Sequence, residues 1–353
     1  MKKSLLNHHL LSRRRVVGAL SAAGAIAALT PASVQAKEAT IRIVYNTLKT
    51  HPIGQFFETL AQEIEKNTET TSVRLKVRTF PNGQLFTDTQ IPDAVSTGTV
   101  EIGQVTLALA NSPDAVASQI GMLPLLWNSW EALWYAEDHD DAWRSVFQAL
   151  LNKLGMQLLG FTPFGVFEFY ANRPIKLPAN FKGLRLRGVG VELSNFIREL
   201  GASPVTMSAH EMYQATQRGT IDGFITGPSS VYDKKLYEVV KYSTAASFLF
   251  GTNPAAANLQ WWSGLPKDVQ AAITKAAVVA QQKARAQVKA VDQHAIEQIA
   301  KLGVTIQTLT PAEHELWVKA AKPVHDKYLN RAGNEGRKLL AIAQEANAKF
   351  PAR

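Results

Sequence analysis

Two arginines in residues 181–192, which read FKGLRLRGVGVE, are of a type and spacing suited to binding an anion. Leu184 and Leu186 alternate with Arg185 and Arg187, a pattern that predicts a half-buried strand. Residues two apart on a strand project to the same face, so both guanidinium groups belong to one side of it. From the residues alone, Arg187 has two readings of equal weight: it binds an anionic ligand, or it forms an internal salt bridge.

Two other polar clusters have simpler structural explanations. Residues 138–141 read DHDD, but four consecutive residues do not converge on one metal ion, and the last two aspartates are suited to capping the helix that follows. His210 and Glu211 point apart on a helix, so a helix opening after Ser208 with Glu211 at the capping-box position is favoured over an acid–base pair. The sequence also lacks the common hydrolase, nucleotide-binding and zinc-protease motifs. We therefore predict no enzymatic activity, no metal site and no cofactor.

The N-terminus has the three regions of a secretory signal. The basic stretch SRRR at 12–15 is followed by an apolar run at 16–29 and by a small-residue cleavage site, VQA, at 34–36. The run is shorter than the roughly 20 apolar residues of a spanning helix. Its Ser-Arg-Arg-x-apolar-apolar order resembles a twin-arginine signal, with an arginine-rich general-secretion signal as the alternative. We predict a cleavable signal peptide over residues 1–36 and a periplasmic mature chain.

The charge and cysteine content exclude several classes of protein. The 353-residue chain has a formal net charge of +9, of which the signal supplies five, leaving +4 on the mature chain. No run of lysine and arginine remains there, so the composition is not that of a nucleic-acid-binding protein. The absence of cysteine excludes disulfides, cysteine metal ligands and a cysteine nucleophile, and it also excludes a lipoprotein anchor at the cleavage point.

Strand and helix patterns alternate along the first two thirds of the mature chain. The first set predicts strands at 40–46, 72–80 and 99–105 and helices at 53–65 and 88–96. A second set predicts further strands at 155–161, 165–172, 184–187 and 220–226. Such alternation is typical of a mostly parallel sheet covered by helices. Two α/β units in one exported chain suggest two lobes with a cleft between them.

The C-terminal third is predicted to be helical. A long helix begins near Pro266, which suits a first helical turn, and extends to about Leu302. A second begins at Thr310, where Glu313 occupies the capping-box position, and is interrupted around 330–336. Helices of this length can brace both lobes.

Short motifs along nearly the whole mature chain together resemble one known family. The chain is similar to the periplasmic solute-binding subunits of TRAP (tripartite ATP-independent periplasmic) transporters, the DctP family. The motifs are HP at 51–52, PNGQL at 81–85, GTVEIG at 98–103, LPLL at 123–126, NRPI at 172–175, FKGLRLRG at 181–188, GASP at 201–204, EMY at 211–213, QRGTIDG at 217–223 and LP at 265–266.

The resemblance implies an α/β, two-lobed periplasmic binding protein fold, with crossing strands between the lobes and a long bracing C-terminal helix. It assigns residues 37–160 to lobe I and 161–250 to lobe II. Residues 251–353 then return to lobe I and form the C-terminal helices that brace both lobes.

The resemblance also nominates the binding residues. In this family the second arginine of the Gly-Leu-(Lys/Arg)-x-Arg element pairs with the ligand carboxylate, which implies that role for Arg187; Arg185 is then expected to be solvated. Some relatives, such as the sialic-acid binders, have a further arginine at the position of Phe167. They also have an asparagine shortly after the Asp-Gly pair, whereas this chain has FITGP at 224–228, which includes Thr226. The matching pocket positions near the first and third strands are Asn46 and Thr106. This set suggests a monocarboxylate with an apolar or aromatic body.

The function implied is non-catalytic. The protein would capture a small organic acid and deliver it to the two integral-membrane subunits of an ion-gradient-driven TRAP transporter. It is expected to be a monomer and to bind no nucleic acid. The alternative is a binding protein that presents its ligand to an ABC transporter or a sensory receptor.

Overall fold

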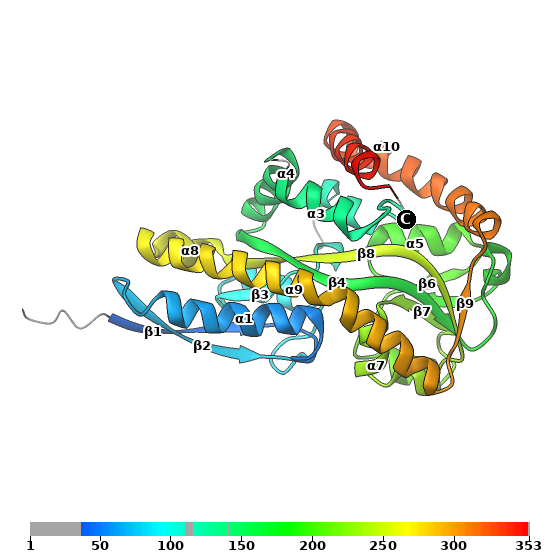
Figure 1. Cartoon of the computed structure of the whole chain (residues 1–353), viewed down its shortest axis with the longest axis horizontal. Helices are drawn as coiled ribbons and strands as arrows, with labels where there is room; N and C mark the ends of the chain where they lie inside the picture. Colours follow the sequence, from blue (N-terminus) through cyan, green and yellow to red (C-terminus); the bar gives the residue numbers. More distant parts are fainter. Residues whose placement is uncertain (1–36, 110–115, 140, 352–353) are drawn as a thin grey trace, which may run out of the picture. The chain divides into compact units, whose positions relative to one another are not determined.

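The computed structural model describes residues 37–109, 116–139 and 141–351 (Figure 1). The predicted signal peptide at 1–36 lies outside the described residues. So does Asp140, the first of the two aspartates expected to cap the following helix. All described residues fall in one compact unit, Ala36–Arg353.

The strands of the described residues form one mixed sheet in the order β2-β1-β3-β8-β4-β7-β5-β6, with β9 paired to β8. Their bounds are β1 (Lys37–Val44), β2 (Val73–Phe80), β3 (Ile102–Gln104), β4 (Met156–Ala171), β5 (Arg185–Arg187), β6 (Ser203–Val205), β7 (Gly223–Thr226), β8 (Tyr242–Asn258) and β9 (Thr305–Thr308).

The sheet has two parallel parts joined by two long strands. In the first half-sheet, β1 pairs in parallel with β2 and β3; in the second half-sheet, β5 pairs in parallel with β6 and β7. β4 and β8 are 16 and 17 residues long and run antiparallel to each other between the two half-sheets (Figure 1). The prediction of a mostly parallel sheet therefore holds within each half-sheet and is wrong where the long strands join them.

Helices cover both faces of this sheet. Their bounds are α1 (Pro52–Asn67), α2 (Ile91–Ser96), α3 (Trp130–His139), α4 (Asp141–Lys153), α5 (Gly190–Glu199), α6 (Met212–Gln217), α7 (Pro228–Asp233), α8 (Leu259–Gly264), α9 (Lys267–Lys301) and α10 (Pro311–Lys349), with short 3₁₀ turns at Leu107–Leu109, Ala117–Met122, Pro178–Phe181 and Leu236–Glu238. Among the described residues, no helix is long and apolar enough to cross a membrane.

The long helix α9 is the brace that the sequence predicts. It packs against α1 beside the first half-sheet, against β4 in the centre and against α7 beside the second half-sheet (Figure 1). Small apolar residues recur along its buried face, including Ala276, Ala280 and Ala284, which allow the helices to approach closely. One element thus packs against helices beside both half-sheets and against the long strand β4 between them.

The C-terminal helix α10 follows its predicted pattern. Thr310 and Glu313 form the expected capping box, in which the Thr310 N–H donates to Glu313 Oε2 at 2.8 Å. The predicted interruption is a kink at Gly333, whose φ of 60° is readily adopted by glycine. Trp317 of this helix is fully buried among the aromatic rings of Phe169, Phe181, Phe196 and Phe248.

Several predicted elements differ from the structure. The strands expected at 155–161 and 165–172 are one continuous strand, β4, because β8 pairs along its whole length despite register shifts. The third strand is shorter than expected and covers only Ile102–Gln104. The helix expected from residue 88 begins at Ile91, which leaves Asp88 in the loop before it.

Candidate functional site

The predicted site residues lie mainly at the carboxyl ends of parallel strands. Asn46 and Thr106 each follow a strand of the first half-sheet by two residues, whereas Arg187 and Thr226 are the last residues of β5 and β7 in the second half-sheet. Phe167 lies within β4. All five are buried, with relative exposures of 3 to 8%. In α/β folds, ligands bind in the crevice outside the carboxyl ends of parallel strands, so four of the five residues occupy the expected edge.

Arg187 is buried, but its hydrogen-bonding capacity is only partly used. Its Nε and Nη2 atoms both donate to the Met207 carbonyl oxygen at 3.3 Å. Nη2 also lies 3.8 Å from Asp88 Oδ2, within ion-pair range but beyond a hydrogen bond. No hydrogen bond from Nη1 to a described residue is present. Both readings of Arg187 thus have support: it has an internal acidic neighbour, and it keeps free donors for a carboxylate.

Asp88 was missed by the sequence analysis and connects the two half-sheets. It lies between β2 and α2, and its Oδ1 accepts a 2.5 Å hydrogen bond from the Ser208 hydroxyl. Its Oδ2 accepts a 3.2 Å hydrogen bond from the backbone N–H of Ala209. Ser208 and Ala209 follow β6 in the second half-sheet, close to the helix α6. A local sequence pattern does not reveal such a residue, because its partners are more than a hundred positions away.

Lys234 is a second cation that the sequence did not single out. It follows α7, and its Nζ lies 3.5 Å from the backbone carbonyl oxygen of Asn46. The described residues provide no carboxylate within ion-pair distance of it. Beside it, Asn46 Oδ1 and Thr47 Oγ1 are buried and have no hydrogen-bond partner in the described part of the chain. Buried polar atoms are normally paired, so these two atoms mark a place where a ligand can supply the missing partner.

The electrostatics tie these groups into one cluster. Burial lowers the pKa of Arg187, and the carboxylates of Asp88 and Glu211 oppose that shift. Burial likewise lowers the pKa of Lys234; Asp88 and Asp233 oppose the shift, while Arg187 adds to it. The two cations therefore interact with acidic groups from loops of both half-sheets.

The phenylalanines near the site are packed against other rings. Phe167 makes an edge-to-face contact with Phe164, with ring centroids 4.8 Å apart. Phe164 in turn contacts the imidazole of His51, the residue that caps α1. Phe169 is fully buried in the cluster around Trp317 and belongs to the core. Of the three, Phe167 remains the one that is predicted to line a binding site.

Arg185 corrects an expectation. It is not simply solvated: its Nε and Nη2 donate to the two carboxylate oxygens of Asp222 at 3.1 and 2.9 Å. The Arg185 side chain is still 49% exposed, and it points out of the cluster that holds Arg187. This pair ties the start of β5 to the turn before β7, because Asp222 also accepts a hydrogen bond from the Arg185 backbone N–H.

Two buried carboxyl groups lie where the long strands lose their regular register. Glu168 accepts hydrogen bonds from the backbone N–H groups of Ala246 and Ser247, both at 2.9 Å. Asp292 of α9 accepts from Val166 N and from Ser229 Oγ, both at 2.8 Å. Burial raises the pKa of Glu168 to about 8 and that of Asp292 to about 7. These groups hold β4 against β8, α7 and α9.

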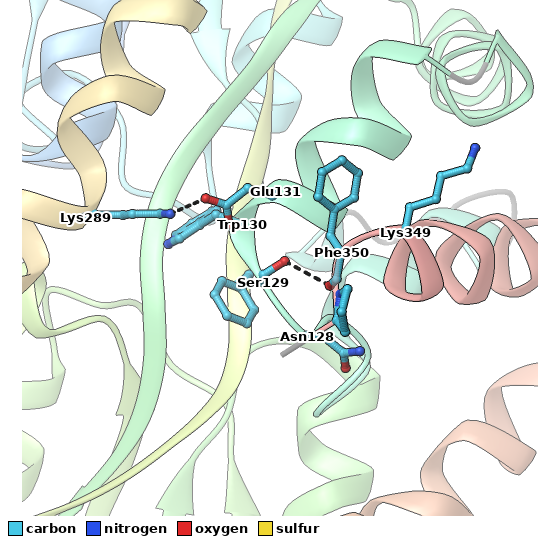
Figure 2. Close-up of a pocket in the computed structure, with 9 residues that line it drawn as sticks. Asn128, Ser129, Trp130, Glu131, Lys289, Lys349 and Phe350 are labelled. Carbon is cyan, nitrogen blue, oxygen red and sulfur yellow. Dashed lines mark hydrogen bonds and ion pairs between the residues drawn. The ribbon is translucent and has the colours of Figure 1, made fainter. Parts of the chain in front are cut away.

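The pocket in Figure 2 is separate from the predicted residues. It has a volume of about 520 Å³ and lies between the start of α3 and the end of α10. Its lysines already have partners, because Lys289 pairs with Glu131 and Lys349 pairs with Glu345. Another pocket, of about 490 Å³ between α1, α7 and α9, also contains none of the five predicted residues. Neither pocket presents an unpaired cation to a carboxylate.

Two parallel half-sheets joined by long crossing strands and braced by one long helix define the class of periplasmic solute-binding proteins. Residues 43–331 match the model of the family described as bacterial extracellular solute-binding protein, family 7, or DctP. The chain belongs to this family, as the resemblance in its sequence predicted. The helix that spans both half-sheets is thus a feature of a receptor fold.

Known proteins agree with this assignment. The chain is 29% identical over 344 residues to the C4-dicarboxylate-binding periplasmic protein DctP of Rhodobacter capsulatus, covering 95% of this chain and 99% of that protein. Its fold is similar to a marine metagenome TRAP solute-binding protein specific for pyroglutamate, at a TM-score of 0.80 and 23% identity, with 88% of this chain and 99% of that one covered. A TRAP solute-binding protein of Shewanella oneidensis with bound succinate gives a TM-score of 0.80 at 24% identity, covering 87% and 99%.

Proposed function

We propose that the mature protein is a periplasmic receptor that binds a small organic acid and delivers it to the two membrane subunits of a TRAP transporter. The observation that carries the ligand class is Arg187, a buried guanidinium at a strand end whose Nη1 makes no hydrogen bond to any described residue. Arginine's planar fork matches a carboxylate bidentately and stays charged at any physiological pH. A ligand carboxylate would complete the hydrogen bonding of this buried guanidinium.

The same proposal includes export and lobe closure. The chain would lose residues 1–36 on export, and residues 37–160 and 161–250 would form lobes I and II, with residues 251–353 bracing both. The ligand would contact Asn46 and Thr106 from lobe I and Arg187 and Thr226 from lobe II, with Phe167 beside it. Because contacts from both lobes exist together only in the closed state, ligand binding shifts the population toward closure.

The partners follow from the family. Its members that are named as TRAP receptors serve a transporter, and we propose that this chain does so as a monomer, without catalysis and without a cofactor. The relatives bind a range of acids, which the names of the proteins above describe as C4-dicarboxylates, pyroglutamate and succinate. A shared carboxylate is the common feature that Arg187 would recognise.

A thermal-shift screen of the purified mature protein tests this proposal. The panel contains monocarboxylates, dicarboxylates, uronic acids, amino acids and uncharged sugars of similar size. A ligand that binds the folded state raises Tm by mass action, so we expect at least one acid to raise it and the uncharged sugars to leave it unchanged. A shift with uncharged solutes, together with none from any acid, would contradict the proposal.

A further inference from the structure

The charges around Arg187 do not suit a ligand with two carboxylates. Two cations, Arg187 and Lys234, interact with three carboxylates, Asp88, Glu211 and Asp233. Asp88 is the nearest to the guanidinium, at 3.8 Å from Nη2, and is 5% exposed. Before any ligand enters, the positive charge is therefore already matched by acidic groups. A dianion would add two more negative charges to this cluster.

Asp88 also keeps the capacity to accept further hydrogen bonds. A carboxylate has about four lone-pair sites, and Ser208 and Ala209 use one on each oxygen. A second acceptor, Asn46 Oδ1, is buried without a partner and belongs to the same half-sheet as Asp88. Arg187, from the other half-sheet, is a donor only. Arg187 thus offers donors from the second half-sheet, and Asp88 and Asn46 offer acceptors from the first.

We propose that Asp88 determines the specificity of the site: it accepts a hydrogen bond from an N–H or O–H group of the ligand while Arg187 binds the ligand's single carboxylate. The ligand class is then a monocarboxylate with a hydrogen-bond donor close to its carboxyl group, and dicarboxylates are disfavoured. This inference depends on the proposed function, since it assumes that Arg187 binds an acid. It differs from the C4-dicarboxylate specificity in the name of the Rhodobacter capsulatus relative.

Titration calorimetry with four matched acids tests the inference on the wild-type protein. L-pyroglutamate has one carboxylate and a ring N–H, cyclopentanecarboxylate has the carboxylate alone, and succinate and glutarate have two carboxylates. We expect pyroglutamate to bind about tenfold or more tightly than cyclopentanecarboxylate, because a buried acceptor left unpaired costs about that factor. We expect both dicarboxylates to bind more weakly still. A wild-type protein that prefers succinate or glutarate overturns the inference.

The substitution Asp88→Asn removes the charge and preserves the shape. It should lower the preference for pyroglutamate over succinate by about tenfold or more, because like charges placed together cost several kcal/mol and one of them is gone. Asp93→Asn is the matched control, because Asp93 is an exposed acid on α2 and should leave the ratio unchanged. If Asp88→Asn does not fold, the wild-type panel still decides. If acids bind and the ratios do not depend on Asp88, the inference alone fails; if no acid binds at all, the proposed function fails with it.

Discussion

Ser208, which follows β6 of the second half-sheet, donates a 2.5 Å hydrogen bond to Asp88, which follows β2 of the first. Close to this bond, a Cβ atom placed on Gly83 would lie 2.7 Å from His210 Nε2, so the loops that carry these residues are in direct contact. The structure therefore represents a state in which the loops at the strand ends are in contact.

A closing motion is the first prediction. Ligand binding should reduce the radius of gyration measured by small-angle scattering, because the ligand adds contacts that exist only when the lobes are together. Ser208→Ala removes one hydrogen bond to a charged group, a contribution of about 1.5–3 kcal/mol, so its unliganded form should have a larger radius than the wild type. Identical scattering profiles with and without saturating ligand would contradict lobe closure.

The second prediction concerns Arg187. Arg187→Ala should weaken binding of a good acid ligand by roughly 10²–10⁴-fold, because removing one partner of a buried charge pair costs ~3–5 kcal/mol. Arg187→Lys keeps the positive charge but loses the planar guanidinium that binds a carboxylate through two hydrogen bonds. Its affinity should therefore lie between those of the wild type and Arg187→Ala. Calorimetry on the purified variants measures both effects.

Arg185→Ala is the control for that series. Arg185 lies on the same strand and pairs with Asp222, away from the Arg187 cluster, so its loss should change affinity little. Wild-type binding by Arg187→Ala, or a larger loss of affinity in Arg185→Ala, would show that the wrong arginine has been assigned.

The third prediction is a pH dependence of stability caused by Glu168. Its pKa is about 8 in the folded protein and about 4.3 in an unfolded chain, so between these values the folded state binds more protons. The free energy of unfolding should therefore fall as pH rises from about 4.3 to about 8, by up to ~1.4 kcal/mol per pH unit. Asp292, with a pKa of about 7, acts in the same direction.

Urea denaturation at several pH values measures this slope. Glu168→Gln does not titrate at this position and should show a shallower decline of the free energy of unfolding than the wild type over the same range; Asp292, Glu137 and Asp233, whose pKa values burial also raises, contribute to the slope that remains. Exposed Glu297→Gln on α9 is the control and should keep the wild-type slope. Parallel slopes for the wild type and Glu168→Gln would mean that Glu168 is ionised in the folded protein across the range.

The fourth prediction concerns export. Mature protein from the periplasm should begin at Lys37 or within a few residues of it, as N-terminal sequencing can establish. Changing Arg13 and Arg14 to lysine should block export if the twin-arginine route is used, because that pathway reads the arginine pair. Normal export of this variant would indicate the general secretion pathway, and an intact Met1 on periplasmic protein would contradict cleavage.

Local signals predicted the helices better than the strands. Two helix signals depend only on residues close together in the sequence: the capping box of Thr310 and Glu313, and the apolar spacing of α1. Both were predicted correctly. The sequence predicted two strands, at 155–161 and 165–172, but β8 pairs along both and makes one continuous strand of them. Long-range pairing decided the outcome there, and no window of sequence contains it.

In the candidate site too, residues marked by a local motif were predicted and residues placed by long-range contacts were not. Arg187 was nominated by a motif of eight residues, whereas Asp88 and Lys234 were not nominated at all. Asp88 was read as the start of a helix because its neighbours are helical in pattern, and its contacts with Ser208 and Arg187 exist only in the folded chain. A carboxylate whose partners are distant in the sequence belongs to no local motif, so the sequence alone does not identify it.

The pairing of β3 with β8 has a consequence for how the chain folds. Ile102 pairs with Ala257, so the first half-sheet joins the rest of the sheet only through a strand that is synthesised much later. Contacts of such high sequence separation slow folding, because a long loop must close before they contribute. A nascent chain that ends before residue 255 lacks the strand against which β3 packs. We therefore expect productive folding of the first half-sheet to await synthesis of β8 and to be slow compared with that of helical proteins of similar length.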